Sequence, residues 1–258
     1  MDVDQFQELV EAEGMSSWRR PEWPESGGMS SKVAAHQYRI VFDLLNRYAP
    51  PGEPLHVLDW GSGSCAFSYA LLEQGHQVDA TDFAVPPKEE FLTSRAAGRF
   101  TFTRCADAVA LPFPDGNFDL VLSIGCLEHV RETGGSDTGS LAEIARVLKV
   151  GGTFICAHLP NRYSYIEGYV RFFDRPGRFY HRFRYTPREI REKAGAAGLE
   201  VTDLTAYGAL PRNPLSRLPA RVRDAPVFIR SYDAADDLLA ALAGGICQNF
   251  AWAGVKRA

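Results

Sequence analysis

The chain has 258 residues, enough for one large α/β domain with a sizeable core, and its 45% hydrophobic and 23% charged residues are ordinary for a globular protein. A net charge of −4 argues against a general nucleic-acid binder, which usually carries a basic excess. The five cysteines never form a CxxC pair, so neither a disulfide framework nor a structural zinc site is expected. The acidic start lacks the apolar segment of a signal peptide, and no apolar run approaches the length of a membrane span. We therefore expect a cytoplasmic protein with no stable membrane insertion.

The periodic segments alternate between strands and helices. In chain order, we predict a strand at 55–59, a helix at 65–74, strands at 76–81, 100–104 and 118–123, a helix at 141–148, a strand at 153–158, a helix at 187–197 and strands at 199–205 and 247–255. This alternation predicts an α/β fold with a mostly parallel sheet and helices on both faces. Ligands of such sheets bind at the carboxyl ends of the strands.

Two stretches interrupt the alternation. Residues 161–185 carry nine aromatic residues and six arginines, and residues 208–232 are rich in proline and arginine. Long connections without clear periodicity are often lids or binding loops. We therefore expect an N-terminal cover segment at 1–32, followed by a domain at 33–258 with lid-like insertions at about 160–185 and 208–240.

The segment VLDWGSGSC at 57–65 predicts a ligand-binding turn between the first strand and the first helix. Gly61 and Gly63 let the backbone approach a ligand closely, and the helix N-terminus then offers N–H groups to an anion. The turn also fits a GxGxxA dinucleotide pattern, with Asp82 at the distance of a ribose ligand, so a nicotinamide cofactor and an adenosyl cofactor are both open. Asp59 favours the adenosyl cofactor, because its carboxylate would hold an amine and repel a pyrophosphate.

Six segments in order resemble the motifs of class I S-adenosylmethionine-dependent methyltransferases, most closely the small-molecule group that includes quinone-biosynthesis enzymes. They are VLDWGSGS, VDATDF, CADAVALPFPDGNFDLVLS, LEHV, EIARVLKVGGTFI and YTPREIREKAGAAGLEV. The resemblance covers about residues 33–207 and the final strand. It implies a Rossmann-like, seven-stranded, mostly parallel sheet with helices on both faces and an antiparallel last strand. It also implies S-adenosyl-L-methionine as cofactor and S-adenosyl-L-homocysteine as product.

The resemblance also implies the residues that bind the cofactor. They are Asp59, Gly61, Ser62 and Gly63 around the methionine part, Asp82 on the ribose, Phe83, Asp107 and Ala108 at the adenine, and Ser123 and Ile124 near the methyl group. Cys65 replaces the usual third glycine of the turn, and Trp60 is an unusual occupant of its variable position. We expect a slightly shifted helix start without loss of binding.

Methyl transfer leaves the protein to position the acceptor and remove its proton. His129, just past the fourth predicted strand, is the candidate base, with an orienting or capping role as the alternative. Glu128 is expected to contact the cofactor's end or cap backbone N–H groups, because adjacent residues of a helix do not face one another. We expect no metal, since Glu128 and His129 are too few ligands. Gly125 stands where related cation-binding proteins carry another acidic ligand.

The candidate acceptor-binding residues are Tyr38, His158, Asn161, Tyr163 and His181, each with packing in the core as the alternative role. The eleven arginines of the two insertions favour an anionic, partly aromatic or glycosyl acceptor. A salt-bridged surface and an anionic membrane surface are the alternatives. A homodimer is compatible with the sequence.

We predict O-methylation of a small molecule, with N-methylation next. A non-catalytic subunit that binds S-adenosylmethionine and an NAD-dependent oxidoreductase are the rivals from other classes.

Overall fold

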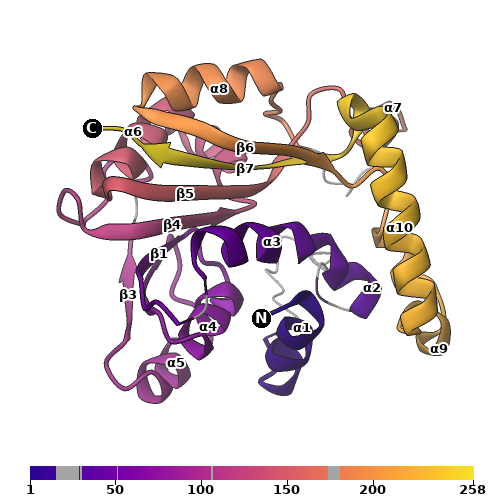
Figure 1. Ribbon diagram of the computed structural model, residues 1–258, viewed down its shortest axis with the longest axis horizontal. Helices are drawn as coiled ribbons and strands as arrows, with labels where there is room; N and C mark the ends of the chain where they lie inside the picture. Colours follow the sequence, from indigo (N-terminus) through magenta and orange to yellow (C-terminus); the bar gives the residue numbers. More distant parts are fainter. Residues whose placement is uncertain (16–28, 30, 51, 106, 174–180) are drawn as a thin grey trace.

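The computed structural model describes residues 1–15, 29, 31–50, 52–105, 107–173 and 181–258. Its centre is a seven-stranded sheet in the order β3-β2-β1-β4-β5-β7-β6 (Figure 1). The strands are β1 (His56–Trp60), β2 (Gln77–Asp82), β3 (Phe100–Arg104), β4 (Phe118–Ile124), β5 (Leu148–Pro160), β6 (Leu199–Tyr207) and β7 (Asn249–Lys256). Five neighbouring strands, β3, β2, β1, β4 and β5, pair in parallel, and β7 runs antiparallel to β5 and β6. The predicted Rossmann-like sheet with an antiparallel last strand is confirmed.

Helices flank the sheet on both faces. The α-helices are α1 (Val3–Ala12), α2 (Lys32–Ala35), α3 (Arg39–Tyr48), α4 (Ala66–Glu73), α5 (Glu89–Arg95), α6 (Asp137–Val147), α7 (Tyr165–Phe172), α8 (Pro187–Ala196), α9 (Ala220–Arg223) and α10 (Pro226–Ala243). Short 3₁₀ helices are η1 (His36–Tyr38), η2 (Leu127–Thr133), η3 (Asn213–Arg217) and η4 (Gly244–Ile246). None of the described helices is long and apolar enough to cross a membrane.

Two hydrophobic cores follow from the alternation of side chains along the central strands. Val57 of β1 packs into the core beneath α3, α4 and α5, whereas Leu58 packs into the core beneath α6 and α8. Figure 1 shows α6 and α8 on one side of the sheet, opposite α3 and α4. Helix α8 begins at Pro187 after Thr186, as predicted, because Thr186 and Glu189 form a reciprocal capping box.

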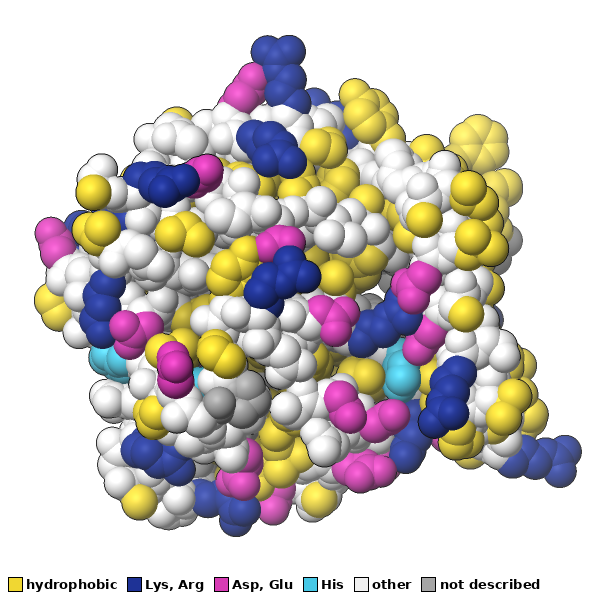
Figure 2. Space-filling model, in the orientation of Figure 1, with side chains coloured by type: hydrophobic (Ala, Val, Ile, Leu, Met, Phe, Trp, Pro, Cys, Tyr) yellow, Lys and Arg dark blue, Asp and Glu magenta, His cyan; other side chains and the backbone are white. Residues whose placement is uncertain are grey.

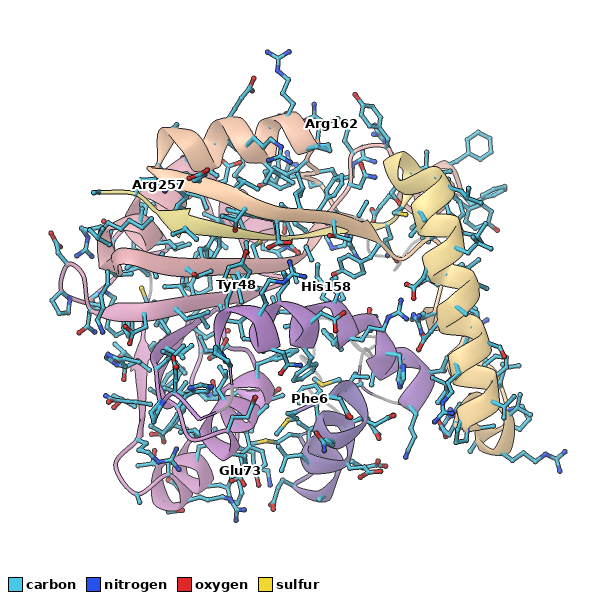
Figure 3. All side chains as sticks on the ribbon, in the orientation of Figure 1. Phe6, Tyr48, Glu73, His158, Arg162 and Arg257 are labelled. Carbon is cyan, nitrogen blue, oxygen red and sulfur yellow. The ribbon has the colours of Figure 1, made fainter. Side chains whose placement is uncertain are left out.

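The N-terminal helices pack on the α4 face of the sheet. Phe6 of α1, labelled in Figure 3, is fully buried, and its ring lies 4.9 Å from the ring of Phe42 and 4.8 Å from that of Phe67. Phe6 therefore couples α1 to both α3 and α4. Trp18 and Trp23 of the expected cover segment lie outside the described residues.

Helix α10 gives regular structure to much of the second insertion, which showed no clear periodicity in the sequence. The helix has 18 residues and extends beyond residue 240. This helix could not be predicted from hydrophobic periodicity, because only Ile229 and Asp236 are buried and the helix has no continuous apolar face. Polar contacts attach it to the N-terminal helices instead. His36 Nδ1 lies 2.7 Å from an Asp233 oxygen, and the Arg39 guanidinium pairs with Asp233.

Candidate active site

A cavity of about 380 Å³ opens at the carboxyl ends of β1, β2 and β4. We call it the glycine-turn cavity. Of the residues singled out in the sequence, those that line it are Asp59, Trp60, Gly61, Ser62, Gly63, Asp82, Phe83, Ala108, Ile124 and His129. Asp107 lies outside the lining, where its carboxylate accepts the Val109 N–H at 2.9 Å. Ser123 is fully buried and also lies outside the lining.

The turn after β1 is a tight left-handed structure. Gly61 has φ +75°, and a Cβ atom there would lie 2.3 Å from the Cys126 Sγ atom. Gly63 donates its N–H to an Asp82 carboxylate oxygen at 2.9 Å, which ties the turn to the end of β2. Cys65 adopts φ +60° as the N-cap, so α4 begins at Ala66, one residue later than the predicted start. The turn keeps its glycine-like path despite the missing third glycine.

Asp59 lies buried beneath this turn. Only 3% of its surface is exposed, and one carboxylate oxygen accepts the Ser68 hydroxyl at 2.5 Å. Burial raises the pKa of Asp59 to about 6, although the hydrogen bond from Ser68 opposes the shift. A nearby cation would restore the ionised form.

His129 lies in the wall of the cavity, on η2 just after β4. Its Nδ1 atom is 2.9 Å from a Glu132 oxygen, and its Nε2 atom is 3.8 Å from Glu128 Oε1. The side chains of Glu128 and His129 therefore approach each other, although we expected adjacent residues of a helix to face in different directions. Glu132 was missed, although its position three residues after His129 is a usual spacing for a helical pair.

Glu128 is almost fully buried behind His129. Burial raises the pKa of its carboxyl group, and the charges of His129 and His181 oppose that shift. Its Oε2 atom has no hydrogen-bond partner among the described residues.

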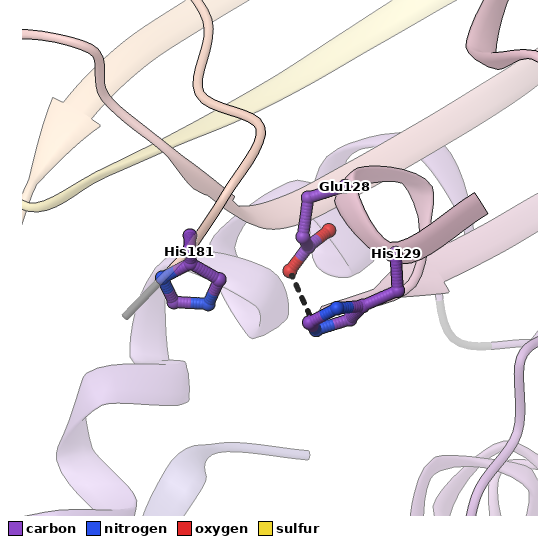
Figure 4. A group of neighbouring side chains, drawn as sticks. All are labelled: Glu128, His129 and His181. Atoms are coloured by element: carbon purple, nitrogen blue, oxygen red, sulfur yellow. Dashed lines mark ion pairs between the residues drawn. The ribbon is translucent and has the colours of Figure 1, made fainter. Parts of the chain in front are cut away.

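His181 is brought to the same place from the first insertion (Figure 4). Glu167 of α7 accepts the His181 backbone N–H at 3.1 Å and lies 2.8 Å from its Nδ1 atom. Burial alone would lower the pKa of His181, but the hydrogen bond to Glu167 and the charge of Glu128 raise it. The ligand atoms of Glu128, His129 and His181 lie within 4.8 Å of one another, so these three side chains offer a metal ion more donors than the two found in the sequence.

Tyr38 and His158 form a wall beside the cavity. Their rings lie 4.6 Å apart, and the Tyr38 ring also meets Phe67, a lining residue, edge-on at 5.5 Å. His158, labelled in Figure 3, has φ +59° and donates its backbone N–H to the Tyr207 hydroxyl at 2.8 Å. Burial lowers the pKa of His158 to about 3, so its ring is neutral. Tyr207 had no signal in the sequence.

Asn161 and Tyr163 lie outside the glycine-turn cavity. The buried Asn161 amide donates to the carbonyls of Gly245 and Cys247, both at 2.9 Å, and accepts the Tyr163 N–H at 3.0 Å. Tyr163 is 63% exposed. The structure therefore gives Asn161 a role in holding loops together and leaves Tyr163 at the surface.

The described arginines of the two insertions do not line this cavity. Several of them pair with carboxylates, as Arg162 does with Glu189 and Arg212 with Asp236. Arg175 and Arg178 lie outside the described residues. The salt-bridged alternative therefore fits the described arginines better than an arginine-lined acceptor site does.

Comparison with known proteins agrees with this geometry. Residues 58–156 match a family described as a methyltransferase domain. A demethylmenaquinone methyltransferase of Deinococcus radiodurans is 31% identical over 195 residues, which cover 68% of this chain and 73% of that protein. The eEF1A lysine and N-terminal methyltransferase of Bos taurus is 30% identical over 149 residues, which cover 53% of this chain and only 21% of that protein. The chain thus matches a small part of that longer relative.

A solved structure shows the same fold. The 1,6-didemethyltoxoflavin-N1-methyltransferase of Burkholderia thailandensis, with bound 1,6-didemethyltoxoflavin and S-adenosylhomocysteine, has a TM-score of 0.59 at 20% identity, covering 100% of this chain and 92% of that chain.

The fold and the glycine turn agree with the methyltransferase relatives that the sequence matches. The chain belongs to the class I S-adenosylmethionine-dependent methyltransferases, and its cofactor is S-adenosylmethionine. The nicotinamide alternative is therefore dropped. The residues present fit the cofactor: the buried Asp59 carboxylate suits its ammonium group, Asp82 suits a ribose diol, and the ring of Phe83 suits a purine.

Proposed function

We propose that this protein transfers a methyl group from S-adenosylmethionine to a hydroxyl oxygen of a small molecule, with His129 as the base. The observation that carries the proposal is the position of His129 in the wall of the glycine-turn cavity, with its ring oriented by Glu132. His129 is the only histidine among the described residues that line this cavity.

The chain's own residues would hold the cofactor at one end of this cavity. Asp59 would take the ammonium group, the Gly61–Gly63 turn would pass under the methionine part, and Asp82 would hold the ribose hydroxyls. When bound, the cofactor supplies an electrophilic methyl group on a sulfonium sulfur. Ile124 and His129 follow along β4 and η2, so the acceptor would meet the methyl group beside them.

His129 is arranged to remove one proton. A carboxylate only accepts hydrogen bonds, so Glu132 selects the tautomer with the proton on Nδ1 and the lone pair on Nε2. The Nε2 atom of His129 would take the proton that the acceptor hydroxyl loses when its oxygen receives the methyl group, and the electron pair of the carbon–sulfur bond would remain with the cofactor's sulfur. The partial exposure of His129 gives that proton a route to solvent.

The lining indicates a mainly apolar, hydroxylated acceptor. Apolar side chains contribute much of the cavity wall, among them Met29, Phe67 and Val130. The described arginines of the two insertions do not line this cavity, so the proposal sets no charge on the acceptor. It involves no metal.

The test measures S-adenosylhomocysteine formation with a panel of phenols, catechols, sugars and amines. His129→Asn should lower the turnover number about 10²- to 10⁴-fold, the usual contribution of a general base, and Glu132→Gln should lower it less. The exposed Glu90→Gln on α5 is the matched control. Calorimetric titration with S-adenosylhomocysteine should give the same affinity for all four proteins.

Full activity of His129→Asn would overturn the role of the base, and a preference for amines would overturn O-methylation. Removal of divalent cations with a chelator should leave the rate unchanged. A lost rate that a divalent cation restores would contradict the metal-free reaction and point to Glu128, His129 and His181 as ligands.

A further inference from the structure

A second cavity of about 380 Å³ lies between α3, α10 and the adjoining ends of β6 and β7. We call it the α10 cavity. Figure 2 shows acidic, basic and histidine side chains gathered in the hollow between α3 and α10. The cavity exists partly because small residues line its walls, including Ala206 on β6 and Ala240 and Ala241 on α10. No residue of this cavity lines the glycine-turn cavity.

A chain of contacting side chains connects the lining of the α10 cavity to the lining of the glycine-turn cavity. Tyr207 lines the α10 cavity and accepts the His158 N–H. Tyr38 packs on His158 and on Phe67, which lines the other cavity. A ligand in the α10 cavity would therefore leave the cofactor's place clear.

The cations of the α10 cavity are already matched with carboxylates. Arg212 is buried and donates to the Val33 carbonyl at 3.0 Å, to Asp233 at 2.7 Å and to Asp236 at 3.2 Å. Arg39 pairs with Asp233 and Asp237. These guanidinium groups brace the walls and are poorly placed to capture an anion.

The charge around the cavity is negative on balance. Two guanidinium groups, those of Arg39 and Arg212, face the cavity beside His36. Burial alone would lower the pKa of His36, but its hydrogen bonds to Asp233 and Asp4 raise it. Five carboxylates surround these side chains, namely Asp43, Asp236 and Asp237 in the lining and Asp4 and Asp233 behind His36. A bound cation would reduce this excess.

Asn249 adds an acceptor that nothing in the described chain satisfies. It lies at the start of β7, lines the α10 cavity and is 6% exposed. Its Oδ1 atom is buried and has no hydrogen-bond partner among the described residues. Because buried amide oxygens are almost always hydrogen-bonded, this atom points to a ligand that brings a donor.

We propose that the α10 cavity is a binding site for a small organic ammonium compound, whose N–H groups reach Asn249 Oδ1 once that side chain rotates into the cavity and whose charge is balanced by the surrounding carboxylates. Asp43 on α3 stands at the exposed rim, where a second ammonium group would find a partner. The site does not depend on the proposed methyl transfer, because binding requires no turnover.

The test is a calorimetric titration of the full chain with 1,4-diaminobutane, in the presence and absence of saturating S-adenosylhomocysteine. The probes 1,4-butanediol and butanedioate have similar length but no charge or the opposite charge. We expect saturable binding of the diamine, weaker binding of the diol and none of butanedioate. S-adenosylhomocysteine should not compete.

Two substitutions at one position should act in opposite directions. Asn249→Leu keeps the size of the side chain and should weaken diamine binding about tenfold or more, the usual effect of losing a hydrogen bond to a charged group. Asn249→Asp should tighten it. Leu238→Ala, on the exposed face of α10 away from the cavity, is the matched control and should change nothing. Ala240→Leu fills the space from the opposite wall and should abolish binding even if Asn249→Leu does not fold.

The proposal is overturned if the diamine fails to bind, if butanedioate binds as tightly, or if Asn249→Leu folds and binds like the parent chain. Competition by S-adenosylhomocysteine would also overturn it, because the diamine would then occupy the glycine-turn cavity. These outcomes are independent of any methyl acceptor, so failure here leaves the proposed transferase activity untouched.

Discussion

The affinity for S-adenosylhomocysteine should depend on pH through Asp59. In the free protein, burial raises the pKa of Asp59 from 3.8 to about 6. A shift of this size means that ionising the buried carboxyl group costs about 3 kcal/mol more than in water. The ligand's ammonium group favours the ionised form, so below pH 6 binding must release a proton.

This linkage fixes the sign and the size of the effect. Affinity should be level above about pH 7 and should fall about tenfold by about pH 5, as the carboxyl group becomes protonated. The stability of the free protein shows the opposite sign. A raised carboxyl pKa stabilises the fold fully below the unfolded value, and this contribution is lost as the pH rises through about 6.

Calorimetric titrations across this range would test the linkage, with Asp59→Asn as the decisive variant. It should bind S-adenosylhomocysteine about tenfold to a hundredfold more weakly near neutral pH, and its affinity should no longer vary with pH. Asp115→Asn removes an exposed carboxylate on the loop before β4 and is the matched control. A flat profile for the parent chain, or a persistent slope in Asp59→Asn, would refute the placement of the ammonium group on Asp59.

Three further predictions concern the fold around the site. Gly61→Ala should abolish S-adenosylhomocysteine binding, because the new Cβ would lie 2.3 Å from Cys126 Sγ, and adding Cys126→Gly should restore part of it. His36→Gln should lower the free energy of unfolding more at acid pH than at alkaline pH. Burial alone lowers the pKa of His36, but the bond to Asp233 raises it overall, so its stabilising charge is lost as the pH rises through that raised pKa. Phe6→Ala should cost about 3–5 kcal/mol of unfolding free energy, the usual effect of emptying a buried aromatic position.

Denaturant unfolding at several pH values measures the last two effects, and titration measures the first. Equal binding by Gly61→Ala and the parent chain would show that the turn has more room than its geometry indicates. A pH-independent loss in His36→Gln would mean that packing, and not charge, holds α10 to the N-terminal helices. A loss below about 1 kcal/mol in Phe6→Ala would show that α1 contributes little to the core.

The sheet and the glycine turn could be predicted because their signals are local. An apolar run such as residues 118–123 can only be a buried strand between its turns, and the structure extends it by one residue to Ile124. Thr186 and Glu189 mark a helix start within four residues. Asp59 and Asp82 stand next to strand ends, so the strand predictions alone place them at one edge of the sheet.

The rest of the site depends on contacts between distant segments. Nothing near His181 in the sequence indicates that Glu167 turns it toward Glu128, because that contact is set by how α7 packs. Tyr207 reaches His158 only because β6 lies at the edge of the sheet beyond β7. The ion pairs of the insertions show the same limit: the carboxylate that pairs with Arg162 lies in α8, and one that pairs with Arg212 lies in α10.

The contacts of α10 with the N-terminal helices affect how the protein can be made. During translation, α2 and α3 are synthesised long before α10. The backbone of Lys32 and the side chain of His36 pair with Asp224, at the end of α9, and with Asp233 of α10, so these contacts form only once both helices have been made. A chain that stops before α10 would lack these contacts and would also lack β7, which lies between β5 and β6, so its sheet would be incomplete. We therefore expect stable cofactor binding only after the chain has been synthesised through α10 and β7.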